Sequence, residues 1–529
     1  MCGDEIVQKI YFSYTELDIL APGSTARSIA DMTVYIQTDK KTYNMETAPC
    51  KSDIVLSIDD ESIATVAQNT TTPKNARFTA VKTGKTRSTA SLKGHPEMKG
   101  TITIRVLNLD RLHESISYKD ESNKYIHLYK KPLKLIAKNQ VSQGFDFYTT
   151  DFMYFTQLPE IDVTKTKDGK IEYSHTQLDI FQNDYKKNSA SMKFPASGHG
   201  QNLIAEHIGE KDYLWFASYG TLECTDNNTK CTDGYKRSQT IARVDWDISN
   251  PNQLIYPSDI KDHYYLSDKT GESFFHSFEP AIDVKNNTFS FRATYDKNHR
   301  TYVKTYHLSD VKKLGTSTVK LQRPIQWINK NNEFITGYTP TITVKDFSTL
   351  KPIHEFDKKR IAIQGMELEN SLIYTVGDAR ALLKTLEGND KQYEYRSEIS
   401  IYIYTYGGKS VGGAMPFHYD KLENGNEYIY HLTTVDNPVK NLKKATVDCK
   451  NETSGKCSGY YMDNTKLDGL LNFTENGIQY KHNGYVEAEG IRVMDGKLYI
   501  SATVKYNYIE SGKKQMVRRQ AILVYDLLR

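Results

Sequence analysis

The sequence predicts an all-β protein in which a small β-sandwich is followed by a β-propeller with insertions. Three observations support this fold class. Short segments of alternating apolar and polar residues, separated by turn residues, fill the first 107 residues. In the rest of the chain, a polar residue followed by Gly or Pro introduces a β-hairpin five times. Tyrosine, which suits half-buried strands, occurs 38 times, against 19 Phe and 3 Trp.

Length and charge limit the class of protein further. A chain of 529 residues exceeds one ordinary hydrophobic core, so at least two domains are expected. The net charge is only +4, which disfavours nucleic-acid binding through a basic surface. Apolar runs such as residues 213–219 are far shorter than the roughly 20 residues that cross a membrane, so no transmembrane segment is expected.

The first domain is expected over residues 1–107. Residues 54–66 read as strand, turn and strand, and Gly100–Val106 places Ile102, Ile104 and Val106 on one face. These elements, with Asp-Glu-Ser-Ile-Ala-Thr-Val and Phe-Thr-Ala-Val-Lys-Thr-Gly-Lys-Thr, resemble the bacterial immunoglobulin-like group 2 domain. The resemblance implies an immunoglobulin-like sandwich. Residues 108–125 are polar and are expected to form a linker.

Residues 126–529 contain the repeat. Each copy has the polar residue, its Gly or Pro, an alternating strand, a tight turn and a second alternating strand, and a third strand follows. Sheets of one plan repeated in this way pack radially, so we expect a five-bladed propeller. An insertion is expected at about 407–480. The copies start at Gln143, His199, Glu279, Gln364 and Glu489.

The starts of the five inner strands are expected to meet near the propeller axis. Gln143, His199, Glu279, Gln364 and Glu489, with Gln201 beside them, would form a polar ring. Such a ring could hydrogen-bond sugar hydroxyls or hold a structural cation through its oxygen atoms. It could equally do no more than satisfy buried polar groups at the axis. No other cofactor is expected.

A second resemblance involves Ser197-Gly-His-Gly-Gln-Asn202 together with the Gln-Gly and Glu-Gly starts. These residues resemble the five-bladed propellers of the group that includes helveticin J and teichoic acid biosynthesis protein C, which occur in bacteriocins and phage tail-associated proteins. The resemblance covers roughly residues 126–529. It implies attachment to cell-surface glycopolymers, and it concerns only the axial residues around His199 and Gln201.

Four of the six cysteines close short polar segments, which favours disulfide-bonded hairpin tips over zinc sites. The expected pairs are Cys224 with Cys231 and Cys449 with Cys457. Cys2 and Cys50 are left over and are expected to be free.

Three functions remain open. The first is a non-enzymatic phage virion protein of the tail or its fibres, which contacts other virion proteins or a host glycan or receptor within a symmetric assembly. The second is a bacterial surface lipoprotein that binds a glycan or a partner protein, with Cys2 as the lipid site, because Cys2-Gly-Asp-Glu5 looks like a mature lipoprotein start. The third is a glycan-cleaving enzyme that uses Glu279 and Glu489. We expect no enzymatic activity, since these acids share a repeat position with Gln.

Overall fold

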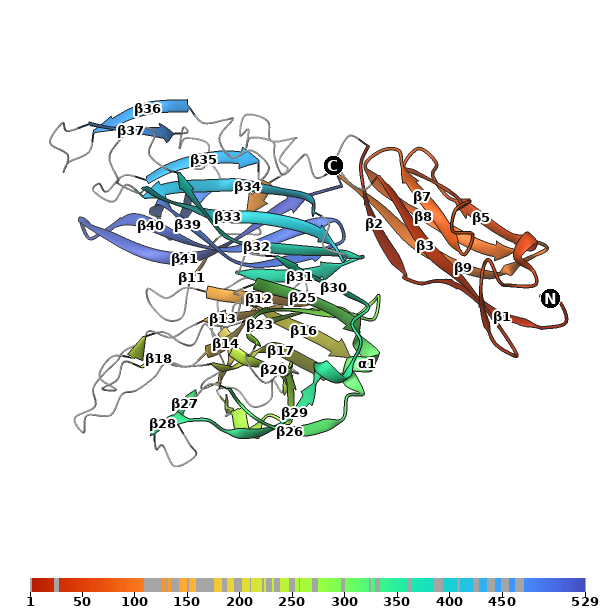
Figure 1. The fold of residues 1–529 in the computed structure, drawn as a ribbon. Helices are drawn as coiled ribbons and strands as arrows, with labels where there is room; N and C mark the ends of the chain where they lie inside the picture. Colours follow the sequence, from red (N-terminus) through yellow and green to blue (C-terminus); the bar gives the residue numbers. More distant parts are fainter. Residues whose placement is uncertain are drawn as a thin grey trace.

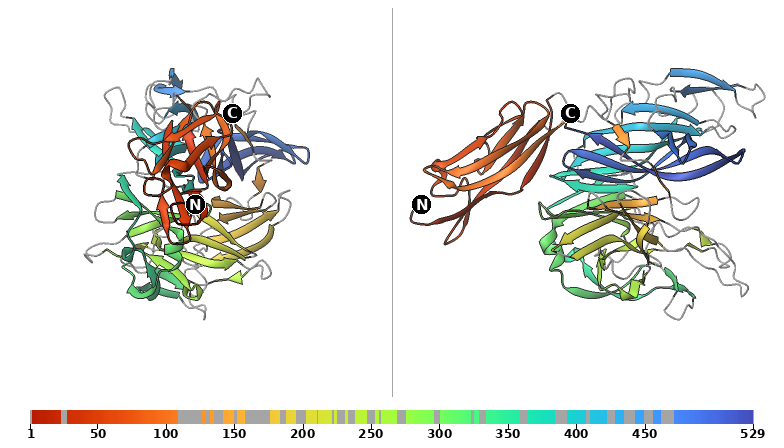
Figure 2. Two further views of the ribbon diagram at one scale, coloured as in Figure 1. Left: turned by 90° about the vertical axis from the view of Figure 1, so that its right-hand side faces the viewer. Right: turned by 180° about the vertical axis from the view of Figure 1, so that it is seen from behind.

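The chain is nearly all β in the computed structural model, and the N-terminal β-sandwich lies beside a larger β region (Figure 1). Figure 2 shows that the sandwich projects from one side of this region. The structure describes residues 2–22, 28–108, 126–128, 132–134, 142–149, 152–157, 176–182, 188–194, 202–209, 211–220, 223–224, 231–232, 238–246, 253–255, 257–268, 275–295, 300–322, 325–328, 334–358, 364–383, 393–406, 410–421, 428–434, 443–448, 456–461 and 471–528.

Two sheets face each other in the sandwich. Alternation puts Val34, Ile36, Phe78, Ile102 and Ile104 into one shared core, where each side chain is at most 1% exposed. The strands fall where the alternating segments were expected. The first sheet contains β1 (Val7–Phe12), β3 (Ile29–Thr38), β7 (Asn75–Ala80) and β6 (Ala64–Gln68), with β4 (Thr42–Asn44) on β3. The second contains β2 (Glu16–Leu20), β9 (His95–Leu107), β8 (Gly84–Leu92) and β5 (Ile54–Ile58), and η1 (Lys51–Asp53) precedes β5.

A disulfide joins Cys2 to Cys50 within the sandwich core. The expectation that these two cysteines are free is therefore wrong. No local pattern indicates this pair, because 48 positions separate the two cysteines and neither lies at a hairpin tip. The bond ties the start of the chain to the segment after β4.

Five larger sheets, called sheets I to V, make up the region after residue 126. In each, the three strands of the predicted repeat pair antiparallel in chain order, and the earliest of these three is called the first strand of its sheet. Sheet I has β12 (Ser142–Thr149), β13 (Phe152–Gln157), β14 (Thr176–Gln182), β15 (Asn188–Phe194) and β21 (Gln253–Leu254). Sheet II has β16 (Leu203–Ile208), β17 (Lys211–Gly220), β20 (Ser238–Trp246), β22 (Asp262–Tyr265), β29 (Thr341–Asp346) and β26 (Thr316–Lys320). Sheet III has β23 (Phe275–Asp283), β24 (Thr288–Tyr295), β25 (Arg300–His307) and β30 (His354–Lys358).

The last two sheets extend beyond the three strands of the predicted repeat. Sheet IV has β31 (Gly365–Glu369), β32 (Leu372–Leu383), β33 (Tyr393–Thr405), β34 (Ser410–Lys421) and β35 (Tyr428–Thr434), so part of the expected insertion extends this sheet. Sheet V has β39 (Ile478–Met494), β40 (Lys497–Glu510) and β41 (Lys513–Asp526), with β38 (Phe473–Glu475), β10 (Ile126–Leu128) and β11 (Leu133–Lys134) added. The smaller elements are β18 (Glu223–Cys224), β19 (Cys231–Thr232), β27 (Ile325–Ile328), β28 (Phe334–Tyr338), β36 (Lys443–Asp448), β37 (Lys456–Tyr461), α1 (Leu308–Lys312), η5 (Pro257–Asp259) and η6 (Phe347–Thr349).

The first strands of the five sheets contact one another in cyclic order: β12, β16, β23, β31, β39 and again β12. β10, near the start of the larger region, pairs with β41 near the end of the chain, which joins the two ends of that region in one sheet. This arrangement is the one expected of a radial repeat. The assignment of five blades stays a prediction.

Candidate functional site

A buried polar cluster, here called the axial cluster, lies where the five first strands meet. Its centre is Arg492 on β39, which is 4% exposed. The Arg492 guanidinium forms ion pairs with Asp146 of β12, at 3.1 Å from Nε to Oδ1, and with Glu367 of β31, at 3.0 Å from Nη1 to Oε2. One arginine therefore holds sheets I and IV to sheet V through charge.

Asn202 completes the axial cluster. It lies just before β16 and is 1% exposed. Its Nδ2 donates to the backbone oxygens of Pro280 on β23 and Met366 on β31, and its Oδ1 accepts from Arg492 at 3.5 Å. The axial cluster thus includes a group from, or directly before, each of the five first strands, and it satisfies polar atoms that would otherwise be buried alone.

The members of this cluster occupy one position of the repeat. Asp146, Asn202, Glu367 and Arg492 each lie three residues after a predicted repeat start. In the remaining copy the corresponding residue is Ile282, and that strand contributes a backbone carbonyl instead. This polar column is therefore visible in the repeat itself, three positions after the column predicted to form the ring.

Burial controls the charge of the cluster. Desolvation raises the pKa of Glu367 to about 8, although Arg492 lowers it, and the nearby Asp146 raises it further. Two carboxyl groups share one guanidinium away from water, so near neutral pH one of them, Glu367, keeps its proton. The arrangement balances charge with no excess ion in the core.

Four of the predicted ring residues lie in the described part of the chain. Gln143, Glu279, Gln364 and Glu489 are all buried, with 4%, 3%, 7% and 1% exposure. His199 and Gln201 lie outside the described residues.

Three of the predicted strand starts come close together through their backbones. A Cβ on Gly365 would lie 3.0 Å from the Cα of Gly490, and one on Gly490 would lie 3.4 Å from the backbone oxygen of Gln143. Gly365 and Gly490, which follow Gln364 and Glu489, are therefore needed for this close approach.

Glu279 is bound by an arginine of the same sheet. Arg292 on β24 contacts both carboxylate oxygens, at 2.5 Å from Nη2 to Oε1 and at 2.9 Å from Nε to Oε2. Burial raises the pKa of Glu279, and this ion pair opposes the rise. Such a bidentate contact fixes the carboxylate geometrically.

The cysteines of the expected hairpin disulfides are placed by strand pairing. Cys224 and Cys231 lie directly opposite each other in the antiparallel pair of β18 and β19. Cys457 on β37 lies opposite Val447, and Cys449 is outside the described residues. Both disulfides stay predictions.

Within the described ranges, no three His, Cys, Asp or Glu side chains gather in a way that could hold a metal ion. The same part of the chain has no helix long and apolar enough to cross a membrane.

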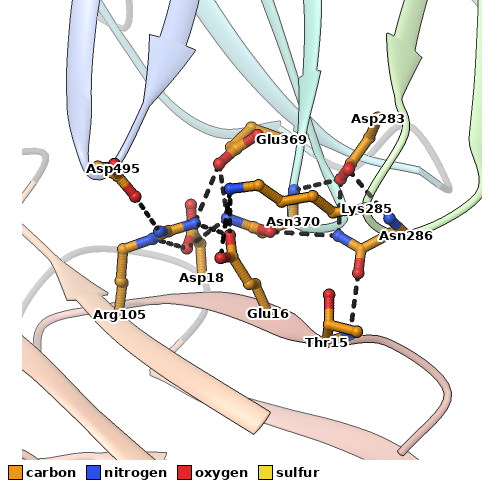
Figure 3. Close-up of polar contacts among 10 residues, drawn as sticks. All are labelled: Thr15, Glu16, Asp18, Arg105, Asp283, Lys285, Asn286, Glu369, Asn370 and Asp495. Carbon is orange, nitrogen blue, oxygen red and sulfur yellow. Dashed lines mark hydrogen bonds and ion pairs between the residues drawn. The ribbon is translucent and has the colours of Figure 1, made fainter. Parts of the chain in front are cut away.

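A second buried cluster, here called the joint, connects the sandwich to sheets III, IV and V (Figure 3). Arg105 of β9 has a fully buried side chain. Its guanidinium binds Glu16 at 2.7 Å and Asp18 at 3.0 Å, both on β2 of the sandwich. From the larger region it binds Glu369 at 3.0 Å and Asp495 at 3.2 Å.

Two asparagines in hairpin turns extend the joint. Asn370 follows β31 with a φ of 49°, a left-handed conformation that asparagine tolerates, and its Nδ2 donates to Asp18 at 3.0 Å. Asn286, in the turn between β23 and β24, donates to Asp283 at 2.7 Å and accepts from the Thr15 N–H at 3.1 Å. Turn residues of the larger region therefore form the surface on which the sandwich rests.

Apolar contacts add to the joint. Leu20 and Leu107 of the sandwich are fully buried in the core cluster that contains Leu372 and Leu498. The Asn108 N–H donates to the backbone oxygen of Leu527 at 2.8 Å. The sequence did not reveal this site, because its contacts join distant positions, with 390 between Arg105 and Asp495 alone, and follow no repeat.

Comparisons with known proteins assign no family. No protein-family model matches the chain, and no curated protein matches it. The tail fibre of Staphylococcus aureus phage P68 aligns with a TM-score of 0.34 and 12% identity, over 76% of this chain and 53% of the fibre. This chain thus spans about half of that fibre's length.

Two further solved structures are similar at a lower TM-score. The β-propeller domain of the Trilobed protease from Pyrococcus furiosus has a TM-score of 0.23 and 8% identity, over 72% of this chain and 97% of that domain. An exo-β-1,3-galactanase from Phanerochaete chrysosporium has a TM-score of 0.26 and 7% identity, over 76% of this chain and 96% of the enzyme. Similarity of this extent does not assign the chain to a family or an activity.

Proposed function

We propose that this chain is a non-enzymatic protein of a phage virion, part of the tail or its fibres, which binds a host-surface glycan or receptor. The larger β region would present the binding face, and the sandwich would connect it to neighbouring virion proteins. The virion assignment rests on the combination of extracellular-type β modules with disulfide-forming cysteines.

The observation that carries the non-enzymatic part is the bidentate contact between Arg292 and Glu279. A glycosidase needs one carboxyl group as acid and another as base or nucleophile, both reachable by the sugar. Glu279 is held by Arg292, and Glu489 is 1% exposed. These environments suit structural carboxyl groups better than catalytic ones.

The disulfide weighs against the lipoprotein alternative. Lipid attachment to a cysteine consumes its thiol, and so does a disulfide, so Cys2 can carry only one of them. Peptide mass spectrometry without reduction distinguishes the two. A Cys2 peptide linked to a Cys50 peptide supports the proposal, whereas a lipid-modified Cys2 peptide supports the alternative.

Two experiments test the function itself. Antibodies against the chain should label the tails of purified particles, and their failure to bind any particle would overturn the virion assignment. The purified full chain should also bind host cell-wall polysaccharide in a sedimentation assay and release no new reducing ends. Release that disappears in Glu279→Gln or Glu489→Gln would establish the enzyme instead.

A further inference from the structure

The joint contains more acidic groups than basic ones. Glu16 and Asp18 lie on β2, and Glu369 lies at the end of β31. Asp283 ends β23, and Asp495 lies in the turn between β39 and β40. The cations are Arg105 and Lys285, the latter 3.3 Å from Glu16. Asp495 is 65% exposed, so water solvates its charge. Full ionisation of the other four acids would therefore give the joint two more negative charges than its two cations balance (Figure 3).

Burial makes such an excess costly. The side chains of Arg105 and Asp18 are fully buried, and that of Glu369 is 12% exposed. Uncompensated charge removed from water is strongly unfavourable, and two changes would lower this desolvation cost. Either some carboxyl groups keep their protons, or the two parts separate and water reaches the charges.

We propose that the joint is a pH-dependent clasp, which holds the sandwich on sheets III to V most tightly in mildly acidic solution and loosens as the pH rises. Protons on the excess carboxyl groups remove the repulsion while Arg105 keeps its contacts. Loss of those protons leaves negative charges facing one another across the interface between β2 and the hairpin turns.

The pKa directions agree with this geometry. Desolvation raises the pKa of Asp18 to about 6, although Arg105 opposes it. The pKa of Glu369 is raised well above its ordinary value by desolvation and by the charges of Asp18 and Asp283. Desolvation also raises the pKa of Asp283.

Other nearby groups do not reverse the effect. Burial disfavours the charge of Glu16, but Arg105 and Lys285 leave its pKa below the ordinary value. Glu16 therefore loses its proton at a lower pH than Asp18 and Glu369 do. The pKa values of Arg105 and Lys285 are raised, and both stay charged. The buried Tyr406 hydroxyl near Asp283 stays neutral because its pKa is raised by desolvation.

The direction of the pH effect follows from linkage. A carboxyl group whose pKa is raised in the docked state binds more protons there than in the open state. Its contribution to docking is present below its ordinary pKa and is lost as the pH rises through the raised value. For Asp18 this window runs from 3.8 to about 6, and the raised pKa of Glu369 extends the loss to higher pH. The apolar contacts of Leu20 and Leu107 provide docking that does not depend on pH.

Hydrogen exchange of the full chain measures the opening directly. The Thr15 and Asn108 amides donate across the joint, so both exchange when it opens. Protection factors correct for the intrinsic pH dependence of exchange, and the Ile104 amide inside the sandwich provides the internal reference. Between pH 5 and 7 we expect the protection of the two joint amides to fall at least about tenfold, with no comparable fall at the reference.

Substitutions locate the cause. In the double variant Asp18→Asn with Glu369→Gln, the fall should shrink below about threefold, because two titrating groups are gone. The matched control is Glu355→Gln, the same change as at Glu369, made at a side chain 58% exposed on β30, and it should behave as the wild type. If the double variant does not fold, Glu369→Gln alone should still reduce the fall. Protection that is constant or increases from pH 5 to 7 in the wild type, or a fall that persists unchanged in the variants, would overturn the clasp.

Discussion

Replacing Glu367 by Gln should flatten the pH dependence of the free energy of unfolding. The pKa of this buried carboxyl rises from its ordinary value of 4.5 to about 8, chiefly through desolvation. The folded state therefore holds a proton that the unfolded state releases, and stability from this group falls as the pH rises from 4.5 towards 8. Gln reproduces the shape of the protonated acid and cannot ionise.

The size of the effect follows from the proton count. One proton held only in the folded state changes the free energy of unfolding by about 1.4 kcal/mol per pH unit. Between pH 6 and 8, the wild type should therefore lose about 2 to 3 kcal/mol relative to Glu367→Gln. The comparison isolates this group, because every other titrating group is common to both proteins.

Urea unfolding at pH 6, 7 and 8, followed by tryptophan fluorescence, measures the difference. The Glu355→Gln control removes an exposed carboxyl and should parallel the wild type. If Glu367→Gln also parallels the wild type, the reasoning about a protonated acid beside Arg492 fails. Asp146→Asn should lower the free energy of unfolding at pH 7 more than Glu367→Gln does, because it removes an ion pair with that arginine.

Three further predictions concern the disulfide, the centre and the close backbone approach. Cys2→Ser removes the bond to Cys50 and should lower the free energy of unfolding by about 4 kcal/mol, because the unfolded chain gains entropy. Urea unfolding measures this change, and a reducing agent should reduce the difference between wild type and variant. Asn202→Leu leaves two backbone carbonyls without their amide donor and should cost about 2 to 3 kcal/mol, seen as a lower Tm with unchanged far-ultraviolet circular dichroism. Gly365→Ala places a Cβ 3.0 Å from a neighbouring backbone atom and should lower the free energy of unfolding by about 1 to 3 kcal/mol. In the control Gly315→Ala the new Cβ meets nothing within 4 Å, so its Tm in the same thermal scan should be close to that of the wild type.

Periodicity predicted the strands well because each strand buries one face. Ile102, Ile104 and Val106 alternate in the sequence and are buried in β9. The hairpin repeat likewise placed the first strands of the five larger sheets, since a tight turn and alternation are local features.

The polar contacts were harder to predict because pairing depends on orientation across strands. The sequence placed Glu279 in a column with its counterparts but did not indicate that Arg292, on the next strand of the same sheet, binds its carboxylate. The charge of Arg492 is buried, and its ion pairs with Asp146 and Glu367, from two other sheets, compensate it. A sequence shows which residues share a repeat position but not which opposite charge lies within reach.

The two buried clusters share the strands β31 and β39, and this has a mechanical consequence. β31 provides Glu367 to the axial cluster and ends at Glu369 in the joint, while β39 provides Arg492 and leads into the turn with Asp495. A shift of either strand would disturb both clusters at once, since the residues are separated by only two or three positions. The sandwich is thus attached to the strands that hold the sheets together, not to a peripheral strand. We therefore expect force applied to the sandwich to reach the centre of the larger region directly, as the proposed function would require.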